Sequence, residues 1–346
     1  MTNRTSSTRT AARLLRRLLG LVTLLVVAAG LGVLSTPARA QDPAGASWPK
    51  QALRIVLPYP AVGPMDLVPR LVAERLGELL EQPVTVDNRP GEPALGALQE
   101  VLAQPADGYT VLAADATHWA LLPALRALPY DFLRDFTPLT LVYSAPQVLV
   151  VAADSPYRSL ADLLAASRKR PFDLRYASTG NATVIQLMTD ALARGLSVQW
   201  RQAPYRSGAD SLQAVVRGDA AFTFASVNGA LSGSRAGYLR MLAVSTRARF
   251  KGLPDVPSLS EQLPLTSFDW PIEQAFVVRA ATPPAISARL AGALAKVMSQ
   301  SDLAERVLEI GGVELKPGSP AQLNASIRAD VARYERALAL SGFKPR

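Results

Sequence analysis

The sequence predicts an α/β protein built from two open lobes. Strand-like and helix-like stretches alternate over residues 53–113 and again over residues 159–225, and each series ends on a strand. Units of this kind almost always form a parallel sheet with right-handed crossovers. The 346 residues of the chain also exceed the roughly 250–300 residues at which a single core stops growing.

The first unit opens with Leu53–Leu57, a short apolar run that is typical of a buried parallel strand and that Pro58 ends. Asp66 is expected to cap the helix after the next loop, because a side-chain oxygen at that point can accept from the free N–H groups. Three further elements are expected: a strand at 84–86, a helix at 94–103 and a strand at 109–113.

The second unit opens with a helix from Ser159 to about Arg170, where Ser159 and Asp162 have the spacing of a capping box. The elements expected after it are a strand at 174–177, a helix at 183–193, a strand at 198–200, a helix at 210–216 and a strand at 220–225.

Two extended apolar stretches, residues 139–152 and 274–280, are able to carry the chain between the lobes. Helices near 284–300, 303–310 and 321–340 are expected to close the chain. We therefore predict a discontinuous first lobe and a continuous second lobe, with residues 48–148 and 272–346 in lobe 1 and residues 149–271 in lobe 2.

Residues 1–40 have the features of a cleavable signal peptide. They hold six arginines and no acidic residue, an apolar run at Leu18–Leu34, and the small-x-small site Ala38-Arg39-Ala40. We expect cleavage near Ala40 and a periplasmic mature protein. An uncleaved membrane anchor is the alternative, because about 17 apolar residues approach the length that spans a bilayer. Arg16-Arg17 leaves both Sec and twin-arginine export open.

The composition excludes several classes of protein. Removing the six leader arginines from the 37 lysines and arginines leaves 31 basic residues against 28 acidic ones, too even a balance for nucleic-acid binding. The chain has no cysteine, which excludes disulfides and thiolate metal sites. Its one histidine, His118, argues against a zinc enzyme. We expect neither a metal nor a cofactor.

Signatures of catalysis are missing as well. The sequence has no G-x-x-x-x-G-K-[ST] phosphate loop and no G-x-S-x-G nucleophile elbow. A serine triad would have to use His118, which is expected in a loop where it could instead contact a ligand or cap the turn. A secreted serine hydrolase is kept as an alternative to a protein without catalytic residues.

Ligands of open α/β sheets bind at the carboxyl ends of the strands. Here those ends are expected at 59–66, 114–118, 178–181 and 204–208, which are rich in small and hydroxyl residues. Backbone N–H groups and helix dipoles in such loops favour an anion. The alternative is that the glycines only make tight turns and the hydroxyls only cap helices.

Several short motifs occur in a fixed order from Trp48 to the last helix. They are L-R-I-V-L-P-Y-P at 53–60, D-N-R-P-G at 87–91, P-A-D-G-Y-T at 105–110, L-P-Y-D at 128–131, Y-A-S-T-G-N at 176–181, P-Y-R-S-G at 204–208 and L-P-D-V-P at 253–257. Through their order and spacing, the chain resembles the Bug/TctC family of extracytoplasmic solute receptors, the substrate-binding components of tripartite tricarboxylate transporters.

The resemblance implies a periplasmic-binding-protein-like fold, with two lobes joined by crossover strands and a small organic carboxylate in the cleft between them. It also implies a membrane permease as partner, no catalytic residue, and a monomer. Carried over by position, the ligand-binding residues would be Tyr59, Ala61, Val62, Gly63, Met65, Asp66, Thr117 and His118 in lobe 1, and Ser178, Thr179, Asn181, Tyr205 and Ser207 in lobe 2.

The chain departs from the family pattern in the first loop. Val62, Pro64 and Met65 stand in a loop that is usually Pro-Gly-Gly-rich, and Pro64 has no N–H to donate. Ala225 stands near the cleft where an acidic residue is common, which removes a partner for a ligand ammonium. We therefore expect a plain carboxylate with an apolar body against Val62 and Met65. A ligand-sensing receptor for a membrane signalling partner, or a receptor with changed or lost binding, stays open.

Overall fold

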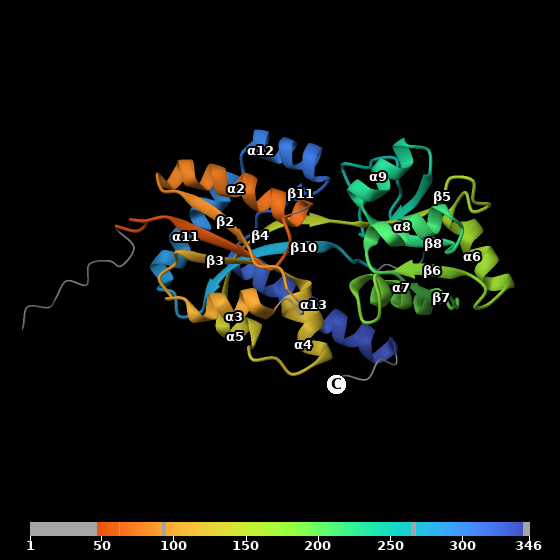
Figure 1. Cartoon of the computed structure of the whole chain (residues 1–346), viewed down its shortest axis with the longest axis horizontal. Coiled ribbons are helices and arrows are strands. Elements are labelled where there is room, and N and C mark those ends of the chain that lie inside the picture. The colour runs from red at the N-terminus through yellow and green to blue at the C-terminus, as the bar shows by residue number, and fades with distance from the viewer. Residues whose placement is uncertain (1–46, 62, 92–94, 264–267, 342–346) are drawn as a thin grey trace, which may run out of the picture. The chain divides into compact units, whose positions relative to one another are not determined.

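The computed structural model describes residues 47–61, 63–91, 95–263 and 268–341. The predicted signal peptide, Val62 and the predicted start of a helix at residue 94 lie outside these ranges. Figure 1 shows the helices and strands with the labels used below. No helix within the described ranges is long and apolar enough to cross a membrane.

Within the described residues, six strands form the first sheet. Their bounds are Leu53–Leu57 for β1, Val84–Asn88 for β2, Thr110–Asp115 for β3, Phe136–Ala145 for β4, Ile272–Arg279 for β10 and Glu314–Leu315 for β11. Their spatial order is β11-β4-β10-β3-β1-β2. β1 pairs in parallel with β2 and β3, as the strand-helix-strand pattern predicts, whereas β10 runs antiparallel between β3 and β4.

The second sheet has five strands in the described part of the chain. Their bounds are Gln147–Ala152 for β5, Arg175–Ser178 for β6, Arg201–Pro204 for β7, Phe222–Ser226 for β8 and Leu239–Val244 for β9. Their spatial order is β7-β6-β8-β5-β9. β6 is parallel to β7 and β8, and β5 runs antiparallel to β8 and β9. Each sheet thus combines a parallel unit with an antiparallel strand, and the predicted α/β class is confirmed.

Helices cover both sheets. Their bounds are Pro64–Leu80 for α2, Leu95–Ala103 for α3, Leu122–Leu125 for α4, Phe132–Asp135 for α5, Leu160–Lys169 for α6, Val184–Gly195 for α7, Gly208–Val216 for α8, Val227–Arg235 for α9, Leu259–Gln262 for α10, Pro284–Met298 for α11, Ser301–Arg306 for α12 and Pro320–Ser341 for α13, with π-helical turns η1 at Thr117–Leu121 and η2 at Val307–Gly311.

The two faces of the first sheet pack against different helices. Ile55 and Leu57 of β1 point into a core with α2 and α11, while Val56 between them points into a core with α3 and α13. This alternation follows from the two-residue repeat of a strand. Figure 1 shows α2 and α3 on opposite sides of these strands. Both faces of the sheet are therefore covered, and what is left for a ligand is the edge where the strands end.

Two segments carry the chain between the sheets. β4 ends at Ala145 and β5 begins at Gln147, so only Pro146 separates them, and the chain returns to the first sheet before β10. Ser245, which is fully buried, ties the two segments together. Its Oγ accepts a hydrogen bond from Gln147 N at 3.0 Å and donates one to Trp270 O at 2.7 Å. β5 starts two residues before the predicted boundary at residue 149, and the lobe boundaries themselves stay a prediction.

Two local expectations were wrong. Helix α2 is capped by Gly63, with Pro64 as its first residue, because proline fits the first helical position, where its missing N–H is not needed. Asp66 instead lies inside the first turn. The strand expected at 198–200 begins at Arg201, because Val198 N donates to Ala193 O and still belongs to the turn that ends α7.

Helix α9 and strand β9 were not expected from the sequence pattern. Helix α9 contains Gly229 and Gly233, and glycine weakens a helical pattern. The structure shows why a glycine fits at the second position: a Cβ on Gly233 would lie 2.3 Å from Leu239 Cδ1 of β9. Glycine therefore stands at this position of the helix because the close packing against β9 leaves no room for a side chain.

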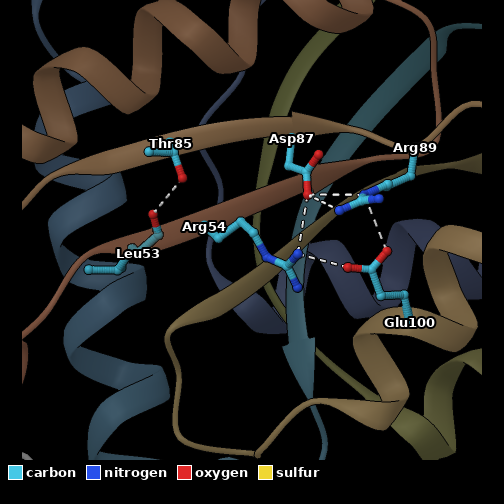
Figure 2. Close-up of polar contacts among 6 residues, drawn as sticks. All are labelled: Leu53, Arg54, Thr85, Asp87, Arg89 and Glu100. Carbon is cyan, nitrogen blue, oxygen red and sulfur yellow. Dashed lines mark hydrogen bonds and ion pairs between the residues drawn. The ribbon is translucent and has the colours of Figure 1, made fainter.

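A half-buried network of charged residues joins β1, β2 and α3 (Figure 2). Arg54 Nη1 donates to Asp87 Oδ2 at 3.1 Å and to Glu100 Oε1 at 2.7 Å. Arg89 forms ion pairs with the same two carboxylates. The Asp-Asn-Arg stretch of the D-N-R-P-G motif thus has a structural role, because its acid and its arginine fix the end of β2 to the neighbouring elements.

Candidate functional site

A cavity of about 500 Å³ lies at the carboxyl ends of the strands. Met65 and Asp115 line it from the first sheet, and Gln147 and Ile272 line it from the segments that join the sheets. The remaining wall comes from the second sheet and its helices. This is the place where open α/β sheets bind ligands.

The first turns of three helices line the cavity. They contribute Val184 and Ile185 of α7, Gly208 and Ala209 of α8, and Gly229 of α9 together with its N-cap Ser226. Side-chain caps satisfy one N–H in each first turn, since Thr183, Ser207 and Ser226 accept from the third helical residue. The first N–H groups of a helix have no partner within it, and the helix dipole makes this end positive. The second sheet thus presents a wall that suits an anion.

Asp115 gives the opposite wall a different character. It is the charged residue among the described residues that line the cavity, and its side chain is 12% exposed. Burial alone would raise the pKa of Asp115, but the nearby His118 and the hydrogen bonds from Thr117 outweigh burial and leave the pKa below its usual value. Asp115 is therefore ionised at neutral pH, and the cavity has an anionic pole.

The predicted residues of the first loop lie in different surroundings. Met65 lines the cavity, Ala61 and Gly63 are exposed, and Val62 lies outside the described residues. Asp66 is buried beside the loop, where its carboxylate accepts hydrogen bonds from Arg70 Nε at 3.0 Å and Asn88 Nδ2 at 2.8 Å. Burial alone would raise the pKa of Asp66, but these bonds outweigh it and lower the pKa. Asp66 thus holds the loop to the end of β2.

Tyr59, Thr117 and His118 surround Asp115 behind the cavity wall. Thr117 N donates to Asp115 Oδ1 at 2.8 Å, and His118 Nδ1 lies 2.9 Å from the same oxygen. Asp115 N also lies 3.2 Å from Nδ1, but the shorter contact fits a proton on Nδ1. The Tyr59 hydroxyl is 3.5 Å from Nδ1. Burial, and then the charge of Asp115, raise the pKa of Tyr59 well above its usual value, so the phenol is neutral.

The predicted residues of the second lobe lie near the cavity, and two of them form part of its wall. Ser178 and Thr179 line it. Ser207 caps α8, next to the lining residues Gly208 and Ala209. Asn181 is exposed in the loop after β6, and Tyr205 lines a smaller cavity with Arg206 and Asp210.

Other residues of the wall were not singled out by sequence reasoning. They include Asp115, Gln147, Ile185, Leu212, Thr223, Phe224 and Ile272. Asp115 lay within the expected loop at 114–118, but β3 continues through it, and a strand of known register would have shown which face it occupies. Gln147 and Ile272 approach the cavity only because two segments far apart in the sequence cross there, so no local pattern indicates them.

A second cavity, of about 470 Å³, lies at the amino ends of β6 and β8, where Arg175 and Ala221 line it. This edge faces away from the carboxyl ends of the strands, so the first cavity is the better candidate for ligand binding. In the described ranges, no group of three or more acidic or histidine side chains is placed to hold a metal ion.

The fold and sequence are similar to those of known proteins. A UPF0065 protein of Bordetella bronchiseptica is 29% identical over 327 residues, covering 94% of this chain and 95% of the relative. Protein BugT of Bordetella pertussis is 27% identical over 247 residues, which are 71% of this chain and 73% of that protein.

Among solved structures, "R. palustris Rpa4515 with adipate" is 28% identical with a TM-score of 0.74, covering 86% of this chain and 100% of the other. The periplasmic binding protein BugD shares the fold at 22% identity, with a TM-score of 0.70 over 86% of this chain and all of the other. The model of the tripartite tricarboxylate transporter family receptor, TctC, matches residues 68–342. The two-sheet fold, the resemblance in the motifs and this match agree: the chain belongs to the TctC family of solute-binding receptors.

Proposed function

We propose that this protein is a non-enzymatic periplasmic receptor that binds a small organic carboxylate in the cavity between the two sheets. The observation that carries the proposal is the convergence of the first turns of α7, α8 and α9 on one cavity. Free N–H groups and three positive helix ends can hold a carboxylate without a lysine or arginine. The family match and the solved relative that carries adipate support the same class of ligand.

A receptor function also fits the surroundings of His118. Its side chain is 1% exposed and its Nδ1 contacts Asp115 Oδ1 behind the cavity wall. A serine hydrolase needs an imidazole within hydrogen-bond reach of the serine that attacks the substrate. The buried position of His118 therefore supports a protein that binds its ligand unchanged.

The remaining parts of the proposal follow from the family. The mature protein would be released by cleavage near Ala40, act as a monomer, close its two lobes on the ligand and deliver it to the membrane permease of a tripartite transporter. Closure about the segments next to Ser245 is the hinge motion typical of periplasmic binding proteins.

Calorimetry against a panel of mono-, di- and tricarboxylates tests the proposal. At least one acid is expected to give binding heat and to raise the melting temperature, because a ligand that binds only the folded state stabilises it. A panel without any heat or thermal shift would contradict the proposal.

A pair of glutamate substitutions sharpens this test. Ala209 is the second residue of α8 and lines the cavity, whereas Ala285 is the second residue of α11, and both are exposed. A carboxylate at this position suits the helix dipole in each case, so neither Ala209→Glu nor Ala285→Glu should lower the melting temperature without ligand. Only Ala209→Glu should weaken carboxylate binding, because its charge repels the ligand inside the cavity.

A further inference from the structure

A separate cavity, of about 340 Å³, lies between helices α7 and α13. Ala191 and Gly195 of α7 line it, together with Phe268 and Trp270 of the segment that leads into β10. The candidate site uses the opposite end of α7, where Ile185 lines it, and the ten positions between Ile185 and Gly195 span about 15 Å of helix. The two cavities are therefore distinct. A volume of this size falls in the range of about 300–1,000 Å³ that small-molecule sites occupy.

Most of the described residues that line the α7–α13 cavity are apolar. Phe268 and Trp270 are almost fully buried, and Ala337 and Leu340 add apolar side chains from α13. Leu340 is 52% exposed, which is unusual for a large apolar side chain in the described part of this chain. A ligand with an apolar body would remove this surface from water, which favours its binding.

Arg333 of α13 brings a guanidinium to the cavity in a fixed position. Its Nη1 donates to Asp269 O at 2.6 Å, its Nη2 pairs with Asp330, and its Cζ lies 5.3 Å from the centre of the Trp270 ring. A guanidinium has five N–H donors, so these contacts leave donors for a ligand. The ion pair with Asp330 balances the charge of Arg333, and the cavity still gains a hydrogen-bonding group that is already oriented.

Arg336, one turn further along α13, supplies a positive charge that is not balanced. It lines the cavity, is exposed, and forms no ion pair with another described residue. No acidic residue is among the described residues that line this cavity. The group that fits beside Arg333 and Arg336 is therefore an anion.

The charge of the cavity favours a ligand from outside over the C-terminal residues of the chain. Residues 342–346 follow α13 in the sequence and lie outside the described ranges. They include Lys344 and Arg346 and no acidic side chain. These side chains have the same sign of charge as Arg333 and Arg336, whereas an external anion has the opposite sign.

We propose that the α7–α13 cavity is a second binding site, for an organic anion whose apolar body covers Phe268, Trp270 and Leu340 and whose acid group meets Arg333 and Arg336. The proposal goes beyond the carboxylate function of the candidate site and does not rest on it. The two sites differ in chemistry, because the candidate site offers helix ends to an acid group and this one offers two guanidinium groups and an apolar surface.

Three probes with one apolar body and different head groups test the class of ligand. They are 4-phenylbutyrate, 4-phenylbutan-1-ol and 4-phenylbutylamine. Calorimetry on the unaltered protein is expected to show the anion binding about tenfold tighter than the alcohol, the effect of one charge-assisted hydrogen bond. The amine should bind most weakly, because Arg336 repels its charge.

Substitutions locate the binding of 4-phenylbutyrate. Arg336→Gln removes the unbalanced charge at an exposed position and should weaken binding about fivefold. Arg328→Gln is the matched control, because Arg328 is an exposed arginine of the same helix that is bonded to Asn324 and does not line the cavity. Neither this control nor Ala209→Glu, whose charge lies in the candidate site, should change the affinity for 4-phenylbutyrate.

Each other outcome overturns the proposal. If no probe binds, or if the three bind equally well, the cavity does not select an organic anion. If Ala209→Glu abolishes binding of 4-phenylbutyrate and Arg336→Gln does not, the probe occupies the candidate site, so the second site is overturned while the carboxylate receptor stands. If 4-phenylbutyrate binds only to a variant that ends at Ser341, the chain's own C-terminal residues compete for the cavity, and a site for an external ligand is overturned.

Discussion

Removing the hydroxyl of Ser245 should loosen the connection between the two sheets. The residue is fully buried, and its Oγ is the shared partner of Gln147 N at 3.0 Å and Trp270 O at 2.7 Å, one on each connecting segment. The substitution Ser245→Ala therefore removes two hydrogen bonds at once.

The size of the effect follows from these contacts. A buried polar group left without a partner costs about 1–3 kcal/mol. The Trp270 carbonyl is buried and should incur the full cost, whereas Gln147 N is half-buried and regains part of its bond from water. We expect Ser245→Ala to lower the free energy of unfolding by about 2–4 kcal/mol.

Urea unfolding followed by tryptophan fluorescence measures this change. The matched control is Thr246→Ala, which removes the neighbouring hydroxyl, bonded to Ala248 O at 2.9 Å at an exposed position, and should change stability by less than about 0.5 kcal/mol. If the two variants differ by less than about 1 kcal/mol, Ser245 does not join the segments in the way that its contacts indicate.

Three other substitutions test separate parts of the structure. Gly108→Ala should destabilise the protein by about 2 kcal/mol or more, because φ is +80° and a Cβ would lie 2.3 Å from Ile286 Cγ2. Thermal unfolding measures this change, and Gly91→Ala is the control because a Cβ there would meet no atom within 4 Å. Burial, and then the charge of Asp330, raise the pKa of Glu273. The native protein should therefore lose stability as the pH rises from the ordinary glutamate pKa through the raised one. Glu273→Gln should reduce that loss, which urea titrations at several pH values measure. Asp66→Asn should behave in the opposite way, because the native pKa is lowered: its destabilisation should be largest above the ordinary aspartate pKa and shrink as the pH falls through the lowered value.

Sequence patterns predicted the elements whose signal is local. The strand at Leu53–Leu57 and the capping box at Ser159 and Asp162 occur as expected, because a buried strand needs a run of apolar residues and a box needs only a fixed spacing. The cap at Asp66 was misplaced, since Gly63 and Pro64 start the helix earlier. Its carboxylate instead accepts hydrogen bonds from Arg70 and Asn88, and the contact with Asn88, 22 positions later, cannot be seen in a local pattern.

The candidate site depends on register and on contacts between distant segments, and these are harder to read from the sequence. The loop with Ser178 and Thr179 was found because a strand end followed by small polar residues is a local signal. Asp115 was passed over because its place in the cavity wall depends on the face of β3 on which it lies, and a strand of unknown register does not show that face.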